Sequence, residues 1–284
     1  VARDLFCSAL WPPHPLGRPV IGREEVIADI KREQILAYRQ KYYQNSQIII
    51  SVSGNIEHQR VQELVEKTFV AKAEPAPARN YPPVNSTPQI ICRSKDIEQI
   101  HLCLGTQGVD LKRGEKKLHA VQLLNTILGG GVSSRLFQEV REQKGLVYSI
   151  YSFHQAGHDT GMFCIYLALS PTNLPEALQI TLNNLAKIRH QGVTKAELQR
   201  AKEQTKGSLF LSLESVNARM SRTAKQEIYL GKQISVEESV AQIEKITLDE
   251  IAEAAWDLFD HQQFTAATVG KWDNPELLTQ LIRS

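Results

Sequence analysis

LGGGVSSRLFQEVREQKGLVYSI, from Leu128 to Ile150, is the stretch of sequence that decides the fold. Three consecutive glycines, Gly129–Gly131, end the apolar helical pattern that precedes them, and Ser133 or Ser134 can cap a second helix. Gly145 is a stop signal for this helix, because glycine readily adopts the left-handed conformation that follows many helices. The residues after Gly145 follow strand spacing. The stretch therefore predicts a helix, a glycine turn, a helix, a second glycine turn and a strand.

The same two periodicities continue on both sides of this stretch. The predicted strands are Gln89–Arg93, Gln99–Gly105, Val147–Gln155, Gly161–Leu169 and Phe264–Val269. The predicted helices are Leu118–Leu128, the helix after the glycines, Pro175–Ile188, Thr194–Leu213, one that opens at Thr247, and a short helix at the end of the chain. Only a short turn separates the third and fourth strands, which predicts an antiparallel hairpin. The fold class is α+β, with mainly antiparallel sheets covered by helices.

A proline-rich segment divides the chain. Residues 71–88 read AKAEPAPARNYPPVNSTP, and their five prolines remove backbone donors and disfavour helix. Such a composition is typical of a linker between domains. We therefore place the linker at residues 73–88.

Two segments on either side of this linker resemble each other without a gap. Ile30–Gly54 reads IKREQILAYRQKYYQNSQIIISVSG, and Ile246–Gly270 reads ITLDEIAEAAWDLFDHQQFTAATVG. The offset is 270 − 54 = 216 residues. Each segment predicts a helix, a short polar turn, a strand and a glycine, although helix–turn–strand units are common enough for this likeness to arise by chance.

The repeat predicts two homologous halves, of which the first is truncated. Residues 1–72 would be the remainder of the first half, and residues 89–284 a complete second half. The second copy starts near Gln89, so the first copy would start before Val1, in a parent protein of roughly 410 residues. The chain begins with Val1 rather than Met, which we interpret as a processing site or a fragment boundary.

Composition excludes several classes of function. The net charge is only +2 and the isoelectric point is near 8.3, so neither nucleic acid nor an anionic membrane is an expected partner. No apolar run reaches the roughly 18 residues of a membrane-spanning helix. Cys103 and Cys164 lie in apolar runs and are expected to be buried, reduced thiols, which favours a cytoplasmic location.

The central stretch, Leu128–Ile150, resembles the second half of pitrilysin/insulinase-type zinc metallopeptidases, the M16-like family, in its small bacterial branch related to processing peptidases. LWPPHPLGRPVIG (Leu10–Gly22) is similar to the segment that follows the zinc site in the first half of the same family. GNIEHQRVQELVEKTF (Gly54–Phe69) and SPTNLPEAL (Ser170–Leu178) also resemble it. These motifs occur in the family's order and cover nearly the whole chain.

The resemblance implies two homologous α+β halves that close around an unfolded peptide. In the family an HxxEH helix and a later Glu of the first half hold zinc, and the Glu of the motif is the general base. None of the eight histidines here forms HxxEH or HExxH. We therefore expect zinc in the parent protein and no metal ligand in this chain. His154 and His158 are four residues apart, but Gly157 lies between them and the segment is interpreted as a hairpin turn, so both are expected to be exposed.

The resemblance also implies particular site residues. Arg141 and Tyr148 match, in type and in spacing, an Arg and a Tyr that hydrogen-bond the substrate backbone and the reacting carbonyl oxygen in the family. One such donor typically lowers a barrier by roughly 3–4 kcal/mol. Without the resemblance, Arg141 would be interpreted as a surface residue and Tyr148 as a half-buried strand residue. Gly130 and Gly131 are the expected substrate-binding loop; no GxxxxGK[ST] or GxGxxG motif supports a phosphate loop.

Two functions remain open at this point. One is part of a zinc endopeptidase that cleaves unfolded peptides or presequence-like segments. The other is a non-catalytic homologous subunit with a structural or peptide-binding role, and an intact HxxEH before Val1 would decide between them. The expected partners are a peptide substrate, the missing N-terminal half, and either a homologous subunit or a second copy in a homodimer.

Overall fold

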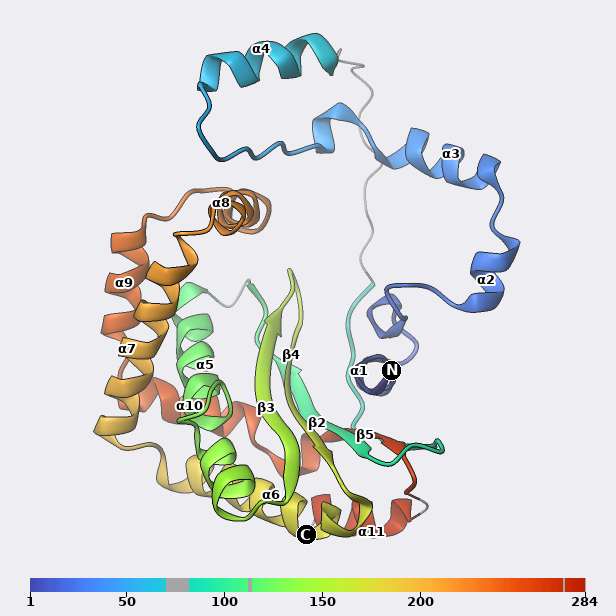
Figure 1. Ribbon diagram of the computed structural model, residues 1–284, viewed down its shortest axis with the longest axis vertical. Coiled ribbons are helices and arrows are strands. Elements are labelled where there is room, and N and C mark those ends of the chain that lie inside the picture. Colours follow the sequence, from blue (N-terminus) through green and yellow to red (C-terminus); the bar gives the residue numbers. More distant parts are fainter. Residues whose placement is uncertain (70–81, 112–113, 273, 284) are drawn as a thin grey trace. The chain divides into compact units, whose positions relative to one another are not determined.

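The computed structural model describes residues 1–69, 82–111, 114–272 and 274–283 (Figure 1). Within them the chain forms two compact units. The first unit comprises Val1–Pro19, Pro83–Lys206 and Val236–Ser284, and the second comprises Val20–Pro82 and Gly207–Ser235. Each unit is thus assembled from segments that lie far apart in the sequence.

A five-stranded sheet forms the centre of the first unit. In order across the sheet, its strands are β1 (Ile90–Ser94), β5 (Thr265–Gly270), β2 (Ile100–Gly108), β4 (Gly161–Leu169) and β3 (Val147–Ala156). Only β1 and β5 are parallel; the other three pairs are antiparallel. The prediction of an α+β fold with a mainly antiparallel sheet is confirmed.

Helices cover one face of this sheet (Figure 1). They are α5 (Glu115–Leu128), α6 (Leu174–Gln191), α7 (Lys195–Ser212) as far as Lys206, α9 (Val236–Lys245), α10 (Leu248–Leu258) and α11 (Pro275–Arg283). Because side chains alternate along a strand, Leu102 and Leu104 of β2 and Phe163 and Ile165 of β4 all enter the core beneath these helices.

The opposite face of the sheet carries α1 (Ala2–Leu10), followed by the 3₁₀ turn η1 (Pro15–Gly17). Leu5 and Phe6 of α1 pack against Cys103, Cys164 and Val269, which are the residues of β2, β4 and β5 that alternate to this side. Cys103 and Cys164 are buried free thiols, as the sequence predicts. No helix was predicted at the position of α1.

The second unit contains helices and an extended segment. Its helices are α2 (Glu24–Asp29), α3 (Arg32–Tyr42), α4 (His58–Thr68) and α8 (Val216–Leu230), with the 3₁₀ turn η2 (Asn45–Gln47). The segment after η2 lies beside α8, since Ser51 Oγ donates a hydrogen bond to the carbonyl oxygen of Met220 at 2.9 Å.

The structure supports the sequence repeat at the level of backbone geometry. Adding 216 to the bounds of α3 gives 248–258, which are the bounds of α10. The same offset relates η2 to η6 (His261–Gln263), since 45 + 216 = 261. Gly54 and Gly270 have φ angles of 146° and 144°. At the start of both helices a side chain accepts from the N-cap backbone N–H, Gln34 Oε1 from Lys31 N and Glu250 Oε2 from Thr247 N, each at 2.8 Å.

One prediction about the repeat is wrong. The residues after η2 were expected to form a strand, but among the described residues 20–69 and 207–235 there is no strand. The equivalent β5 is hydrogen-bonded on both sides, to β1 and to β2. A strand exists only where neighbouring strands satisfy its backbone groups. In the second unit, the residues from Ile48 to Ser53 have no such neighbours in the described part of the chain.

The other predicted elements differ in smaller ways. The helix after the glycines contains a π-helical stretch, η4 (Phe137–Gln143), and η5 (Pro171–Asn173) precedes α6. Neither α8 nor α9 was predicted. Residues 73–81 of the predicted linker lie outside the described residues. The proposed division into residues 1–72, 73–88 and 89–284 is based on the two copies of the repeat, whereas the two units are defined by contacts in space. The division therefore stays a prediction.

Candidate functional site

The glycine loop after α5, Gly129–Gly131, is hydrogen-bonded to the middle of β3. Gly129 N donates to Asn125 O at 3.0 Å, and Ser152 N donates to Gly129 O at 3.1 Å. Ser152 Oγ also donates to Asn125 Oδ1 at 2.7 Å. A Cβ atom at Gly129 would lie 2.6 Å from Ser152 N, so this position has no room for any side chain. The loop therefore starts at a fixed point on the sheet.

The next two glycines are closer to solvent. Gly130 is exposed and Gly131 is half-buried. Ser134 binds the carbonyl oxygen of Gly131 twice, through its backbone N at 3.1 Å and its Oγ at 2.6 Å. Gln138 Nε2 donates to Val132 O at 2.7 Å. These bonds hold the loop in one shape and leave Gly130 at the surface.

An ion pair joins the end of this loop to α7. Arg135 Nε and Nη2 donate to Glu197 Oε1 and Oε2 at 2.6 and 2.9 Å. Glu197 also accepts from the backbone N of Thr194 at 2.8 Å. The hydrogen bonds from Arg135 are the main reason that the pKa of Glu197 is lowered to about 2. Both side chains are mostly buried, so the pair is a fixed part of the structure.

A tight turn leads from η4 into β3. Gly145 has a φ angle of 63°, its N–H donates to Arg141 O at 3.1 Å, and Leu146 N–H donates to Val140 O at 3.0 Å. The left-handed conformation explains why glycine occupies this position. Asn173 Nδ2 donates to Leu146 O at 3.0 Å and secures the start of β3. The predicted helix stop at Gly145 is confirmed.

Arg141 and Tyr148 lie on the two sides of this turn. Arg141 is exposed, and its guanidinium lies over the ring of Phe137, 4.8 Å from the ring centroid. Tyr148 is 60% exposed and lies where the pairing register of β3 shifts, between Val147 and Ser149. Such an irregularity redirects a side chain on an edge strand. Both residues can donate hydrogen bonds to an external group.

The described residues contain no cluster of three or more His, Cys, Asp and Glu side chains that could hold a metal ion. His158 is exposed, as predicted. His154 is not: it is half-buried, its Nε2 lies 3.3 Å from Val109 O, and burial lowers its pKa. Because side chains alternate along β3, His154 lies on the same face of the sheet as Ile150, which is the helix-covered face. The interpretation of this segment as a turn overlooked that placement.

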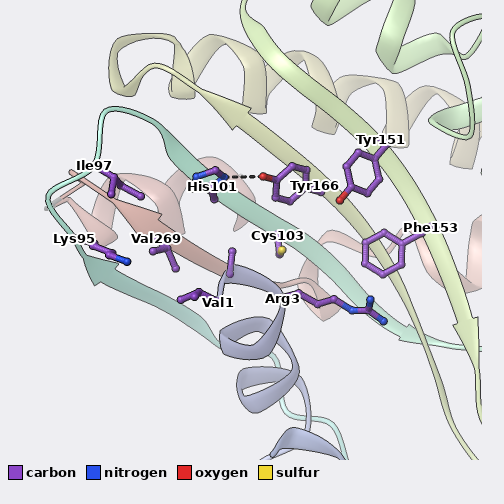
Figure 2. A pocket seen from close by; sticks show the side chains of 11 residues that line it. Val1, Arg3, Lys95, Ile97, His101, Cys103, Tyr151, Phe153, Tyr166 and Val269 are labelled. Carbon is purple, nitrogen blue, oxygen red and sulfur yellow. Dashed lines mark hydrogen bonds between the residues drawn. The ribbon is translucent and has the colours of Figure 1, made fainter. Parts of the chain in front are cut away.

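A cavity of about 730 Å³ opens on the α1 side of the sheet, and the sequence interpretation missed it. Side chains from β2, β3, β4, β5 and α1 converge on it (Figure 2). His101 Nδ1 and Tyr166 Oη lie 2.6 Å apart, and the Tyr151 and Tyr166 ring centroids are 4.9 Å apart. The sequence contained one signal for this cavity, since polar and aromatic residues alternate with apolar ones in the predicted strands. However, only the order of the strands in the sheet shows that these side chains lie together.

Comparison with known proteins defines the class to which this domain belongs. The sequence pattern described as "Peptidase M16 inactive domain" matches residues 29–205. The chain belongs to the peptidase M16 family. It is 37% identical over 259 residues to "Uncharacterized zinc protease YmxG" of Bacillus subtilis, covering 91% of this chain and 63% of that protein. It is 35% identical over 286 residues to an uncharacterized zinc protease of Mycobacterium tuberculosis, covering 99% of this chain and 65% of that protein.

Solved structures show the same fold. A peptidase M16 inactive domain from Pseudomonas fluorescens superposes with a TM-score of 0.86 at 24% identity, over 96% of this chain and 65% of that one. A protease from Helicobacter pylori superposes with a TM-score of 0.82 at 22% identity, over 93% of this chain and 65% of that one. The chain thus spans a little under two thirds of these proteins. Among the described residues, none of the helices has the length and apolar character needed to cross a bilayer.

Proposed function

We propose that this chain is part of a zinc-dependent endopeptidase that cleaves unfolded peptides or presequence-like segments. In this proposal it supplies the groups that bind the substrate backbone and stabilise the reacting carbonyl oxygen. The observation that carries the proposal is the turn around Gly145, which presents an exposed Arg141 and an exposed Tyr148 from fixed backbone. Family membership and relatives named as zinc proteases support it.

Each residue has a distinct role in this proposal. Tyr148 would donate its phenolic proton in a hydrogen bond to the oxygen that becomes negative during the reaction. Arg141 would bind a substrate carbonyl, with its guanidinium oriented by the ring of Phe137. Gly130 and Gly131 would let the peptide backbone approach the loop closely, because no side chain intervenes. The π-helical stretch that contains Arg141 is also a feature often found at functional sites.

The described residues offer no donor set that fits zinc, so we place the metal elsewhere in the parent protein. There it would supply the activated water for hydrolysis. The partners we propose are the peptide and the N-terminal half that completes the protein, with a homologous subunit or a second copy as the alternative. Four free cysteines fit a reducing compartment, and we propose the cytoplasm.

The test compares the full-length parent with this chain alone. We expect the parent to contain zinc by elemental analysis and to hydrolyse an unstructured fluorogenic peptide in a chelator-sensitive reaction, and this chain alone to do neither. A parent that binds the peptide without zinc and without hydrolysis would instead establish the non-catalytic, peptide-binding subunit. Hydrolysis by this chain alone would refute the division of roles.

A further inference from the structure

The cavity on the α1 side of the sheet is lined by side chains from four strands, from α1 and from the loop after β1. Its floor is apolar and includes Cys103 and Val269, and the first turn of α1 and the loop after β1 form two of its walls (Figure 2). Its volume of about 730 Å³ lies within the roughly 300–1,000 Å³ of small-ligand sites. The cavity lies wholly within the first unit.

One wall of the cavity is aromatic and carries hydrogen-bond donors. Tyr151 lies 4.9 Å from Tyr166 and 6.1 Å from Phe153, measured between ring centroids. Phenols are protonated at neutral pH, and burial raises the pKa of Tyr151 and of Tyr166 further, so both can donate hydrogen bonds. The Tyr166 hydroxyl shares its hydrogen bond with His101, which fixes the position of that ring. An aromatic or large aliphatic side chain can pack here beside two phenols.

The charged side chains that line the cavity are both cationic. Arg3 and Lys95 are its charged side chains, and no carboxylate lines it. The guanidinium of Arg3 lies 5.1 Å from the Phe153 ring centroid and donates to the neutral amide of Gln155. Neither Arg3 nor Lys95 has an ion pair among the described residues, whereas the nearby Lys271 is paired with Asp96. An apolar cavity with uncompensated cations favours a ligand that is both apolar and anionic.

We propose that this cavity binds the carboxyl-terminal residue of a peptide that ends in an aromatic or large aliphatic side chain. The side chain packs against the wall formed by Tyr151, Phe153 and Tyr166, and the terminal carboxylate accepts hydrogen bonds from Arg3. This inference rests on the proposed function only in taking a peptide as the ligand. It adds a second contact with the peptide, away from Arg141 and Tyr148, that selects for a free carboxyl terminus.

The chemistry of the lining excludes other ligand classes. A cationic ligand would meet Arg3 and Lys95 without any carboxylate to neutralise it. A strongly hydrated dianion such as phosphate would leave the aromatic wall unused. A carboxyl terminus supplies a planar anion that a guanidinium can bind through two parallel hydrogen bonds, and it carries an apolar side chain on the adjacent carbon.

The test measures binding by the full-length parent, treated with a chelator so that it does not hydrolyse peptides, by fluorescence anisotropy of short unstructured peptides labelled at their amino terminus. Two peptides share one sequence that ends in Phe, one as the free acid and one as the amide. We expect the free acid to bind about tenfold more tightly, because a charge-assisted hydrogen bond is lost in the amide. Arg3→Gln should abolish this difference and leave binding of the amide unchanged. Phe153→Leu should weaken both peptides.

Lys187→Gln is the matched control, because it removes one positive charge from α6 on the helix-covered face of the sheet. It should keep the preference for the free acid. Equal binding of acid and amide by the unmutated parent would overturn the proposal, as would a folded Arg3→Gln variant that keeps the preference. Displacement of the peptide by phenylacetate at much lower concentration would assign the cavity to a small acid instead. The assay needs neither zinc nor hydrolysis, so its failure is separate from failure of the proposed function.

Discussion

Arg135 and Glu197 form a two-pronged ion pair, with donor–acceptor distances of 2.6 and 2.9 Å, between the end of the glycine loop and the start of α7. Glu197 is also the third residue of a capping box with Thr194, whose Oγ1 accepts from Glu197 N at 3.2 Å. One carboxylate thus caps a helix and anchors the helical segment that leads to Arg141. The position of the candidate site therefore depends on a group outside it.

The first prediction concerns the pH dependence of stability. The pKa of Glu197 is about 2 in the folded chain, against an ordinary value of 4.5. A lowered pKa stabilises the fold above pH 4.5, and this contribution is lost as pH falls from 4.5 through 2. Since the pair keeps some contact with solvent, we expect Glu197→Gln to lower the free energy of unfolding at pH 7 by only about 1–2 kcal/mol. Urea unfolding at pH 7 and pH 3 measures this, and the variant should lose less stability on acidification.

Glu203→Gln is the control for this prediction, because it makes the same change on α7 at an exposed carboxylate that pairs with Lys206. It should have little effect at either pH. Equal effects of the two substitutions would mean that the Arg135–Glu197 pair has no special structural role.

The second prediction separates folding from peptide binding in the glycine loop. A Cβ at Gly130 would lie 2.8 Å from the Thr126 backbone, so Gly130→Ala should destabilise the fold by about 1–3 kcal/mol. A Cβ at Gly131 meets only the flexible side chain of Gln204. Gly131→Ala should therefore fold normally and, in the active parent, raise KM several-fold by blocking the approach of the peptide. Thermal unfolding measures the stability of the Gly130→Ala variant, and steady-state kinetics of the parent measure the KM of the Gly131→Ala variant.

Gly207→Ala provides the comparison, because a Cβ there meets nothing within 4 Å. It lies in α7 and should stabilise the helix by about 0.5–1 kcal/mol. If Gly131→Ala keeps the KM of the unmutated parent, the loop has no part in peptide binding.

The third prediction concerns the missing strand of the repeat. Ile49–Gly54 corresponds to β5 at the 216-residue offset, and we expect it to pair with strands on both sides once the N-terminal half is present. Its backbone amides should then exchange slowly with deuterium in the parent and rapidly in this chain alone. The amides of Ala266–Val269 in β5 should be protected in both and serve as the internal reference. Rapid exchange from Ile50 and Val52 in the parent would show that this half never forms the expected sheet.

Much of the fold was predictable because its elements are marked locally. The turns at Gly129 and Gly145, the hairpin of β3 and β4 and the capping box at Thr247 all depend on residues within a few positions of one another. Sequence alone could not place β5 between β1 and β2, since that order depends on contacts between residues some 170 positions apart. It also missed α1, whose burial depends on a sheet that is distant in the sequence.

The candidate site likewise contains some features that local sequence predicts and others that depend on contacts between distant residues. The exposure of Arg141 and the turn at Gly145 follow from local sequence, and the structure agrees with both. The Arg135–Glu197 pair spans 62 positions, and the cavity lined by His101 and Tyr166 depends on strand register. The residues of the ion pair and of the cavity look ordinary one at a time, and only the tertiary fold brings them together.

The last prediction concerns Arg141 and Tyr148 in the zinc-containing parent. If Tyr148 donates to the developing oxyanion, Tyr148→Phe should lower kcat by roughly 100-fold or more with a smaller change in KM, as expected for a contact made mainly in the transition state. Arg141→Ala should also raise KM, because the guanidinium would hold the peptide backbone in the ground state too. Both residues are exposed, so zinc content and melting temperature should barely change. Tyr229→Phe, the same change at an exposed tyrosine of α8, should keep kcat. A zinc-loaded Tyr148→Phe enzyme with the kcat of the unmutated parent would reduce Tyr148 to an ordinary surface tyrosine and would refute the proposed role of the turn.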